Sequence, residues 1–497
     1  MKITFVSPGY ENLAVEYLSS YLKKYGYKTS LVYDPLLFSD CYFNIPKLNN
    51  IFNFTPRVIK EISYQKPDLV AITAITPFYR WALNISENIK KIIDVPIILG
   101  GIHASAVPER VLKNKSIDMI CIGEGEEPLL DVVKTIEKSD YEKLKTIKNI
   151  WCQDSNRKIY KNPPRCLIEN LDSLPFPDKN LFYEKSKAFS NRYLAITSRG
   201  CIFNCTYCSN NVWRNVYDGT SIWNVRKRTV DNVINELLEA VDRWHPEVVS
   251  FVDDAFDMDK KWLEEFAIKY GKEIGLPFTS FAHPKFVDKK LTDLLKKAGL
   301  LGFELGVQSL NEDIKKRILH RYETNNEAIA AIKNIKAAGA DVHIDHIIGL
   351  PGETEEDLKK ASIIYNELKP TRINCFGLEY FPKSKIIETA LEYGLIKKEY
   401  IEYIEEGYQT GFLLGGDTQN TRIFNNFRIL FALLPHISHK KGEKLIKSMD
   451  DVNFSLPNLY KFNSFMYDLL RETDLMVKNF LKYYIEYMFK FVIGKKQ

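Results

Sequence analysis

Short apolar runs alternate with segments of helical periodicity over residues 1–135. Apolar side chains at helical spacing mark residues 13–25 and 80–93. Apolar runs bounded by turn residues predict strands at 3–6, 29–33, 68–73, 95–99 and 119–122. This alternation is typical of an α/β fold with a doubly wound parallel sheet, in which ligands bind at the carboxyl ends of the strands. We therefore expect a ligand-binding domain over 1–135, with its site in the loops after the strands.

The same alternation returns after a proline-containing stretch. Residues 136–190 include Pro163, Pro164, Pro175 and Pro177 and are predicted to form an extended linker. Helices such as 230–244 and 354–368 then separate six strand-like runs, at 193–197, 248–252, 278–281, 302–307, 342–347 and 372–376. Six strand–helix units predict a partial, open (β/α)6 barrel over 191–390, with its site at the carboxyl ends of the strands.

Residues 391–497 are predicted to form a helical domain rich in aromatic side chains. Near its end, Lys478, Lys482, Glu486 and Lys490 form a polar row at i, i+4 spacing, and the remaining face is apolar. The simplest interpretation is a helical cap on the barrel mouth. The alternatives are a surface that receives a lipid or another apolar substrate, and a surface for a partner protein.

Composition narrows the class of protein. Among 497 residues, 45% are apolar and 27% are charged, and a formal charge of +5 is too small at this length to indicate nucleic-acid binding. No apolar stretch reaches the roughly 18 residues of a membrane-spanning helix. The N-terminal apolar run stops at a turn, as a first strand does and a signal peptide does not. We therefore expect a cytoplasmic protein without a transmembrane segment, whose thiols stay reduced.

Three of the eight cysteines lie close together, at Cys201, Cys205 and Cys208. A C-x3-C-x2-C loop lets three thiolates hold three irons of one 4Fe-4S cluster, which leaves the fourth iron open to a ligand. The alternatives are a zinc site or chance spacing, but zinc requires a fourth ligand nearby and the nearest histidine is His245. The other five cysteines are scattered, which favours structural thiols over a second cluster.

With Tyr207 just before its last cysteine, this loop resembles that of the radical S-adenosylmethionine (radical SAM) family. The resemblance implies that the open iron chelates the amino and carboxylate groups of SAM. One electron then splits SAM into methionine and a 5′-deoxyadenosyl radical. The resemblance also implies an electron donor such as flavodoxin or ferredoxin.

Polar residues at two strand ends become SAM contacts in this resemblance. Asp253 and Asp254 end the second barrel strand, where the family receives the methionine ammonium, and a carboxylate suits a cation. Glu304, Gln308 and Ser309 belong to the end of the fourth strand, where Gln308 or Ser309 would bond the ribose or the methionine carboxylate. Relatives often have Glu in place of Gln308. A single residue of this kind is more often a helix cap or part of a solvated turn. Several of them at successive strand ends after the cysteine loop together indicate a SAM site.

The loops after the fifth and sixth barrel strands complete this set. Ile347, Gly349 and Leu350 end the fifth strand and would pack on adenine by backbone and apolar contacts. After the sixth strand, Lys383 and Ser384 stand where relatives usually show Gly-Thr. This departure lies where substrate would approach, so the resemblance leaves the substrate unidentified: a small molecule, a lipid or a peptide.

The loops of the N-terminal domain contain pairs of glycines, which let a large flat ligand approach the backbone closely. Ahead of a radical SAM loop, they resemble the cobalamin-binding domain of the cobalamin-dependent radical SAM enzymes. The resemblance places the nucleotide tail of cobalamin against the segments 73–75 and 100–101. The candidate contacts are Tyr10, Glu11, Asn12, Thr73, Ala74, Ile75, Thr76, Phe78, Tyr79, Gly100, Gly101, Ile102, His103, Gly123, Glu124 and Glu126.

The loop after the first strand departs from many cobalamin proteins because it has no histidine to coordinate cobalt. Phe78 or Tyr79 would then face the lower side of the ring, unless both are ordinary packing aromatics. His103 is a second candidate ligand, although a hydrogen-bonded loop histidine is the simpler interpretation. The alternative for the whole domain is a sheet that binds no ligand and serves for docking.

The resemblance covers about residues 1–385 and predicts a cobalamin-dependent radical SAM enzyme with three cofactors: a 4Fe-4S cluster, SAM and cobalamin. The favoured reaction is hydrogen abstraction from an unactivated carbon, followed by methyl transfer from methylcobalamin. The first alternative is a ring closure, rearrangement or oxidation without methyl transfer. The second is a non-catalytic protein that carries the cluster for binding.

Overall fold

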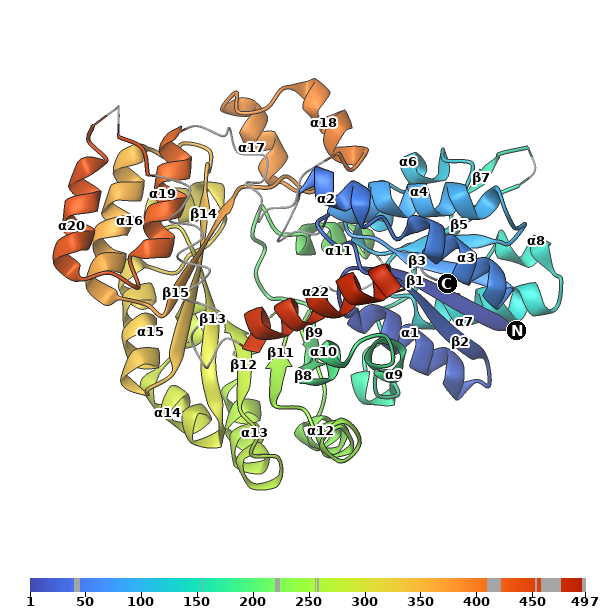
Figure 1. Cartoon of the computed structure of the whole chain (residues 1–497), viewed down its shortest axis with the longest axis horizontal. Helices are drawn as coiled ribbons and strands as arrows, with labels where there is room; N and C mark the ends of the chain where they lie inside the picture. The colour runs from blue at the N-terminus through green and yellow to red at the C-terminus, as the bar shows by residue number, and fades with distance from the viewer. Residues whose placement is uncertain are drawn as a thin grey trace.

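The computed structural model describes residues 1–39, 45–154, 156–219, 224–254, 256, 259–408, 422–451, 454–456 and 475–493. The side chains of residues 46, 475–480 and 493 fall outside this description, as does Cys41. Two sheets, one from each predicted α/β domain, lie side by side (Figure 1). The doubly wound sheet, the open barrel and the helical C-terminal region are all confirmed.

The first sheet has seven strands in the order β2-β1-β3-β4-β5-β6-β7. Strands β1 to β5 are parallel, and the order reverses between β1 and β3, where such folds bind ligands. The strands are β1 (Lys2–Pro8), β2 (Lys28–Asp34), β3 (Leu69–Thr73), β4 (Ile97–Gly100), β5 (Met119–Cys121), β6 (Ile150–Gln153) and β7 (Ile159–Tyr160).

Helices cover both faces of this sheet, which explains why its central strands are almost continuously apolar. One face packs on α1 (Leu13–Lys24) and α7 (Glu126–Glu137). The other packs on α3 (Thr55–Gln65), α4 (Tyr79–Lys90) and α6 (Pro108–Leu112). Shorter helices complete the domain: α2 (Pro46–Ile51), η1 (Thr76–Phe78), α5 (Ile102–Ala106) and α8 (Tyr141–Leu144).

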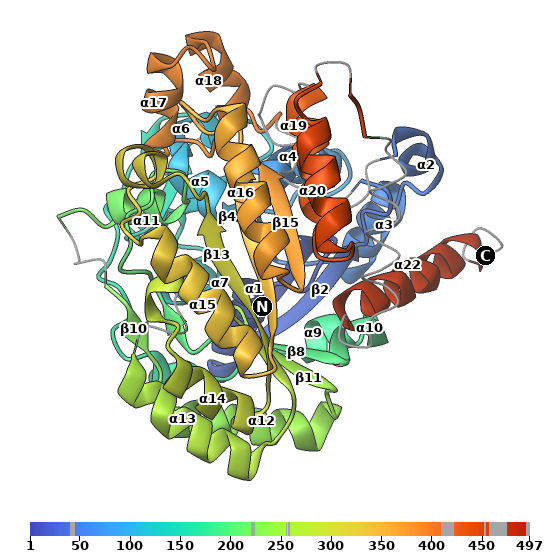
Figure 2. The same ribbon diagram turned by 90° about the vertical axis from the view of Figure 1, so that its left-hand side faces the viewer.

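The second sheet has six parallel strands in the order β15-β14-β13-β12-β11-β8 and does not close. Its strands are β8 (Arg192–Ala195), β11 (Val248–Phe251), β12 (Phe278–Ala282), β13 (Leu300–Gln308), β14 (Asp341–Ile348) and β15 (Arg372–Gly377). Five helices follow one another along its outer side: α12 (Val230–Trp244), α13 (Lys260–Glu273), α14 (Lys289–Ala298), α15 (Asn325–Ala337) and α16 (Glu355–Leu368). Figure 2 views α14, α15 and α16 in front of the strands.

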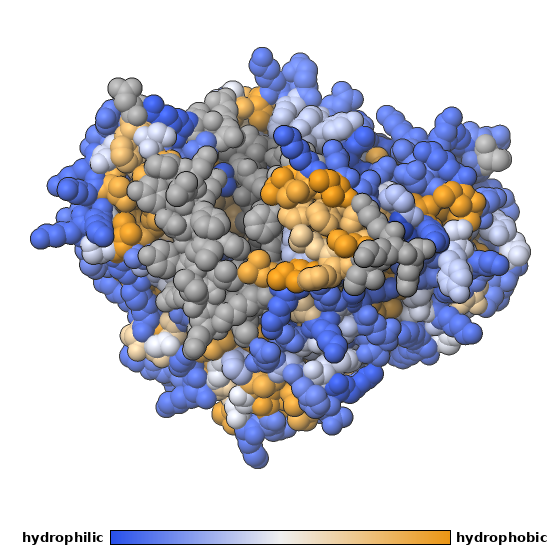
Figure 3. Space-filling view, in the orientation of Figure 1, coloured by the Kyte–Doolittle hydropathy of each residue, from blue (hydrophilic) through white to orange (hydrophobic). Residues whose placement is uncertain are grey.

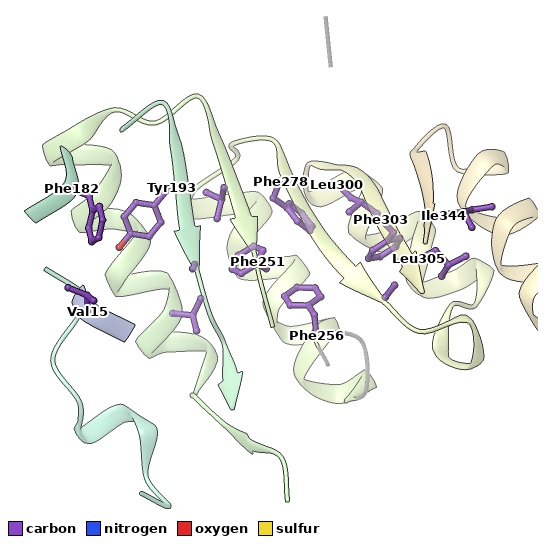
Figure 4. Packing of buried hydrophobic residues seen from close by; sticks show 14 of the residues in the cluster. Val15, Phe182, Tyr193, Phe251, Phe256, Phe278, Leu300, Phe303, Leu305 and Ile344 are labelled. Atoms are coloured by element: carbon purple, nitrogen blue, oxygen red, sulfur yellow. The ribbon is translucent and has the colours of Figure 1, made fainter. Parts of the chain in front are cut away.

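The core of the barrel lies between its strands and these helices. Phe251, Phe278 and Phe303 come from adjacent strands and are buried in a row, with Phe256 beside them (Figure 4). Aromatic rings meet edge to face here: Phe251 and Phe278 have centroids 5.7 Å apart. Packing therefore fixes the strands whose ends carry the predicted site.

Residues 136–190 form more structure than the predicted linker. Strands β6 and β7 pair antiparallel at the edge of the first sheet, so this sheet continues beyond residue 135. The rest includes η2 (Leu171–Ser173), α9 (Asn180–Tyr183) and α10 (Lys187–Ser190). The two strands have only four and two residues, too few to give a periodic signal in the sequence.

Lys179 connects the two domains. Its fully buried ammonium lies 2.7 Å from Glu11 and 2.9 Å from Glu16, and it donates to the Leu194 carbonyl of β8 at 2.8 Å. Although burial works against the charge, the two carboxylates raise the pKa of Lys179. Glu11, a predicted cobalamin contact, is thus placed in a buried ion pair between the domains.

The C-terminal helices divide between the mouth and the side of the barrel. Ile396 and Ile404 share a buried cluster with Ile347 and Leu350, at the carboxyl end of β14, so this part of the region packs over the barrel mouth. α19 (Arg422–Leu433) and α20 (His439–Ser448) pack on β15 and α16, at the side of the barrel. α17 (Ile386–Glu392) and α18 (Lys398–Glu405) reach the first domain, where Arg110 pairs with Glu405 and Glu406 at 3.2 and 2.6 Å.

The last helix, α22 (Leu475–Ile493), packs on the first domain through aromatic side chains. The Tyr483 hydroxyl lies 2.6 Å from the Tyr33 hydroxyl, and the Phe491 ring lies 5.1 and 5.0 Å from those of Phe52 and Phe54. Of the predicted polar row, the side chain of Lys478 lies outside the described residues.

Apolar side chains gather on the surface over α22 (Figure 3). Ile485, Phe489 and Val492 are 55%, 63% and 54% exposed, whereas Tyr483 and Tyr487 are buried. The apolar face predicted for this helix is therefore partly the exposed one. None of the described helices combines the length and the apolar character that crossing a membrane requires.

Candidate active site

The cysteine loop begins at a small antiparallel ladder. β9 (Ser198–Arg199) pairs with β10 (Arg226–Lys227), and the three cysteines lie between these strands, followed by α11 (Asn210–Val216). Cys201 and Cys205 are buried and Cys208 is partly buried. The ladder holds the two ends of the segment together, so that the loop emerges beyond the carboxyl end of β8.

Hydrogen bonds hold the backbone of the cysteine loop in place. Arg214 of α11 donates to the carbonyls of Cys201 and Phe203 at 2.7 and 3.0 Å. The Thr206 hydroxyl donates to the Ile318 carbonyl at 2.6 Å. These bonds fix the backbone from which the three thiols project.

The three thiols lie in a largely buried environment. Burial raises the pKa of Cys201 to about 11 and that of Cys208 to about 12, and the charge of Cys205 adds to the rise in both. Among the described residues, no three His, Cys, Asp or Glu side chains converge closely enough for one ion. In an iron–sulfur cube each thiolate would bind a separate iron.

Tyr207 and Arg321 join the loop to the barrel. Arg321 is buried and donates to the Tyr207 hydroxyl at 3.3 Å, to the Gly306 carbonyl of β13 at 2.5 Å and to Glu323 at 2.8 Å. A permanently charged guanidinium therefore lies beside the cysteine loop. Arg321 was not predicted, since it lies 13 residues beyond the strand end and its partners become apparent only in the fold.

The two aspartates after β11 differ in environment. Oδ1 of Asp253 accepts from the amide and hydroxyl of Thr197 and from the Ser198 hydroxyl, at 2.8, 2.8 and 2.6 Å. Within the described part of the chain, its buried Oδ2 has no hydrogen-bond partner. Burial raises the pKa of Asp253, and the bonds from Ser198 and Thr197 oppose the rise. Asp254 is accessible, and its carboxylate raises the pKa of both Cys201 and Cys208 in addition to the effect of burial. The pair can therefore receive a cation beside the thiols.

The end of β13 is strained at Gln308. Its φ is 64°, in the left-handed region, and the pairing with β14 shifts register between Gly306 and Gln308. Such strain in a non-glycine residue is typical of functional sites. Ser309 is buried, and its hydroxyl accepts from the Asn311 amide at 3.2 Å.

Glu304 lies four residues before the strand end and joins a polar group on β13, β14 and β15. Its carboxylate accepts from Asn374, and it lies 3.5 Å from His343 and 3.8 Å from Arg372. Asn374 also donates to Asp345 at 3.1 Å. Against the effect of burial, His343 and Arg372 lower the pKa of Glu304 to about 2, while burial and then Glu304 raise that of Asp345 well above its usual range. The carboxylate of Glu304 is thus already bonded to neighbouring side chains of the barrel.

The loop after β14 packs toward the cysteine loop. Ile347 and Leu350 are buried in one cluster with the side chain of Tyr207. Glu353 accepts from the amides of Gly349 and Leu350 at 2.7 and 3.4 Å, which closes the turn. The predicted adenine contacts therefore do lie beside the predicted cluster.

A cavity of about 350 Å³ lies between the two domains. Ligand pockets in proteins span roughly 300–1,000 Å³. Its wall contains eight of the predicted site residues, six from the first domain and two from the barrel: Thr73, Gly100, Gly101, Gly123, Glu124, Glu126, Asp253 and Asp254. The loops after β3, β4 and β5 thus open into the same space as the aspartates beside the thiols.

Other predicted cobalamin contacts have partners within the first domain. His103 is buried, stacks on Tyr79 with centroids 4.0 Å apart, and lies 3.2 Å from the Thr76 hydroxyl; burial lowers its pKa to about 3. Asn12 caps α1, and the Tyr10 ring lies 5.6 Å from that of Phe78. Neither these residues nor Glu11, Ala74, Ile75 and Ile102 belong to the cavity wall.

Acidic residues of the first domain pair with arginines of the barrel. Arg199 lies 3.1 Å from Glu124 and 2.5 Å from Glu126, and Arg226 lies 2.9 Å from Glu124. Burial raises the pKa of Glu124, but the two guanidiniums lower it overall. Tyr217 accepts from the Glu124 amide at 2.7 Å. Arg199, Arg226 and Tyr217 also line the cavity, and the sequence reasoning missed them.

Fold and site together define a class: an open barrel that holds a three-cysteine cluster loop against a second cofactor domain. Comparison with protein families agrees, because residues 195–362 match the radical SAM superfamily and residues 6–133 match the B12 binding domain. The chain belongs to the cobalamin-dependent radical SAM enzymes, whose cofactors are a 4Fe-4S cluster, SAM and cobalamin.

Several curated proteins are similar in sequence. An uncharacterized methyltransferase of Pyrococcus horikoshii is 28% identical over 62% of this chain and 65% of its own length, so the match spans slightly less than two thirds of that relative. Cytidylyl-2-hydroxyethylphosphonate methyltransferase of Streptomyces wedmorensis is 24% identical over 81% of each chain. Anaerobic magnesium-protoporphyrin IX monomethyl ester cyclase of Rubrivivax gelatinosus is 26% identical over 78% of this chain and 70% of its own.

A solved structure has the same fold. The radical SAM methyltransferase TsrM of Kitasatospora setae, with cobalamin and a [4Fe-4S] cluster bound, superposes with a TM-score of 0.62 over 79% of this chain and 78% of its own. At 16% identity the likeness concerns the fold alone.

Proposed function

We propose that this enzyme methylates an unactivated carbon of its substrate. The observation that carries the proposal is that one cavity is lined both by the glycine loops of the B12 binding domain and by Asp253 and Asp254 beside the cysteine loop. When bound, SAM on the cluster supplies the hydrogen-abstracting radical, and cobalamin supplies the methyl group. Two curated relatives with methyltransferase names are consistent with this reaction.

The chain's own residues have defined tasks in this proposal. Cys201, Cys205 and Cys208 hold the cluster, and Arg214 fixes the backbone from which they project. The unpartnered Oδ2 of Asp253 and the accessible carboxylate of Asp254 receive the methionine ammonium. Gln308 and Ser309 bond the ribose or the methionine carboxylate, and the loop from Ile347 to Leu350, including Gly349, packs on adenine.

The walls of the cavity hold the second cofactor in the same proposal. Thr73, Gly100 and Gly101 contact the nucleotide tail of cobalamin. A Cβ on Gly101 would lie 2.6 Å from the Ala74 carbonyl oxygen, so only glycine fits this turn. Glu124 and Glu126 do not contact cobalamin directly in this proposal. Their carboxylates hold Arg199, which lines the cavity.

The products of SAM during turnover test methyl transfer. A methylase of this type consumes two SAM molecules per product, one giving 5′-deoxyadenosine and methionine and the other S-adenosylhomocysteine. Near-equal amounts of 5′-deoxyadenosine and S-adenosylhomocysteine are expected with the true substrate. Deoxyadenosine without S-adenosylhomocysteine would favour cyclisation, rearrangement or oxidation, which the cyclase relative keeps as the second candidate. If reduction of the cluster caused no cleavage of SAM, the remaining candidate would be a non-catalytic protein that carries the cluster for binding.

The proposal extends to partners and place of action. The substrate is a small molecule, a lipid or a peptide, and an electron donor such as flavodoxin or ferredoxin reduces the cluster. A reducing cytoplasm suits a thiolate-held cluster and the seven described cysteines, none of which forms a disulfide.

A further inference from the structure

The inner part of the cavity is apolar and lies against one face of the first sheet. Phe5, Ala71 and Ile98 are cross-strand neighbours on β1, β3 and β4, and all three line it. Val15 of α1 and Leu129 of α7 form the opposite wall. A group that enters here is held between a sheet and two helices by apolar contacts.

Among the described residues, the polar groups of the wall around this inner part are mostly bonded already or poor at hydrogen bonding. The Tyr17 hydroxyl, which also lines the cavity, accepts from Arg228 at 3.5 Å. The Cys121 thiol is buried and its pKa is raised to about 12, mainly by burial, so it stays neutral and bonds weakly. Thr73 lies at the carboxyl end of β3, and Glu124 and Glu126 are bonded to arginines. The inner cavity therefore offers poor compensation to a base with several hydrogen-bonding atoms.

We propose that this cavity selects among corrinoids by the lower base of the nucleotide tail. It accepts an apolar base such as dimethylbenzimidazole and disfavours adenine. The inference rests on the proposed placement of the tail. Adenine carries an exocyclic amine and additional ring nitrogens, and burying them unpaired costs affinity, whereas methyl groups fit an apolar wall.

Binding of three corrinoids to the cluster-loaded full chain tests the inference. The probes are aquacobalamin, the analogue whose lower base is adenine, and cobinamide, which has no nucleotide tail. Equilibrium dialysis read by visible absorbance gives each dissociation constant without turnover. Aquacobalamin is expected to bind about tenfold or more tightly than the adenine analogue, and cobinamide more weakly than aquacobalamin.

Equal affinity for the two bases, or a preference for adenine, would overturn the inference while leaving the enzyme a cobalamin protein. Cobinamide binding as tightly as aquacobalamin would overturn it as well, because the tail would then contribute nothing. Failure of all three probes to bind would contradict the proposed function itself.

A substitution inside the cavity sharpens the test. Ala71→Ser adds one hydroxyl to the inner wall and is expected to narrow the preference for the apolar base several-fold. Ala82→Ser makes the same change in α4, where Ala82 is buried on the other face of the sheet, and is expected to leave the preference unchanged. The ratio of affinities is the readout, so a general loss of stability does not imitate the effect. An unchanged ratio in Ala71→Ser would place the base elsewhere and overturn the inference.

Discussion

The guanidinium of Arg199 donates to the carboxylate of Glu126 across the boundary between the domains, with 2.5 Å between Nη2 and Oε1. Arg199 stands two residues before Cys201, and Glu126 begins α7 of the first domain. Against the effect of burial, Glu126 and Glu124 raise the pKa of Arg199, so the charge persists. The cysteine loop is thus anchored directly to the domain that holds the second cofactor.

Arg199→Gln should lower the free energy of unfolding by roughly 3 kcal/mol, because it leaves the buried carboxylate of Glu126 without its cation and Glu124 with Arg226 alone. Arg243→Gln is the matched control: Arg243 pairs with Glu239 at 2.7 Å on the exposed side of α12, and its loss should cost at most about 0.5 kcal/mol. Chemical denaturation followed by fluorescence measures both. A loss in Arg199→Gln no greater than in the control would show that the pair does not stabilise the domain contact.

Changing Cys201, Cys205 or Cys208 to Ala should abolish the brown absorbance of the reconstituted cluster and all SAM cleavage. Each thiolate holds a different iron, so two remaining thiolates cannot retain the cube. Cys166→Ala, at an exposed position far from the loop in sequence, should retain both. Iron content and deoxyadenosine formation are the measurements. Full cleavage in any one of the three loop variants would remove that cysteine from the ligand set.

Gly100→Val should block cobalamin uptake while the apo-protein keeps its stability. A Cβ at Gly100 meets only the Cβ of Cys121 at 3.9 Å, an ordinary contact, so the larger side chain projects into the cavity. Gly101→Ala should instead destabilise the domain, because its φ is 98° and its Cβ would lie 2.6 Å from the Ala74 carbonyl oxygen. Thermal unfolding and corrinoid absorbance separate the two effects. Normal uptake by a folded Gly100→Val would exclude the cavity as the binding site.

Asp254→Asn should weaken SAM binding by about 1.5–3 kcal/mol, the size of a charge-assisted hydrogen bond, with the cluster intact. Asp253→Asn should also disturb the start of the cysteine loop, since Oδ1 of Asp253 accepts from Thr197 and Ser198. Asp259→Asn, at the N-terminal cap of α13, is the control and should leave SAM affinity unchanged. Calorimetry on cluster-loaded protein measures all three. Unchanged affinity in both Asp254→Asn and Asp253→Asn would assign these aspartates to backbone capping.

The pair of Glu304 and Asp345 should show opposite responses to substitution and pH. Asp345 has a raised pKa, so the stability it contributes is present at low pH and is lost as pH rises toward its folded-state pKa. Glu304 has a lowered pKa, so its contribution is present above its unfolded-state pKa, whose usual value is 4.5, and is lost as pH falls toward about 2. Near neutral pH, Asp345→Asn should cost little, whereas Glu304→Gln should cost about 1–2 kcal/mol. Denaturation at several pH values measures both costs. A larger cost for Asp345→Asn than for Glu304→Gln near neutral pH would contradict this assignment.

Local spacing predicted most of what the fold contains. The six barrel strands and α12 lie where apolar runs and helical periodicity placed them, and the cysteine loop follows the first of these strands. Such features depend on residues close together in the sequence. The position of the site at the strand ends could also be predicted, because parallel strands bring their carboxyl ends to one edge of the sheet.

Contacts between domains could not be predicted in the same way. Glu11 meets Lys179 across 168 residues and Arg199 meets Glu126 across 73, and no periodic pattern marks either pair. His103 has the sequence context of a ligand-binding loop, yet its ring is buried against Tyr79. In both cases the packing of a neighbouring element decides what a polar side chain contacts.

The first domain is synthesised long before α22, the helix that packs on its aromatic side chains. Tyr33, Phe52 and Phe54 belong to the first domain, but the side chains that pack on them from α22 come about 440 residues later in the chain. At a synthesis rate of about 5–20 residues per second, these aromatic rings wait roughly 20–90 s for their contacts with α22. The nascent first domain therefore presents an aromatic patch during the interval in which chaperones act on newly made chains.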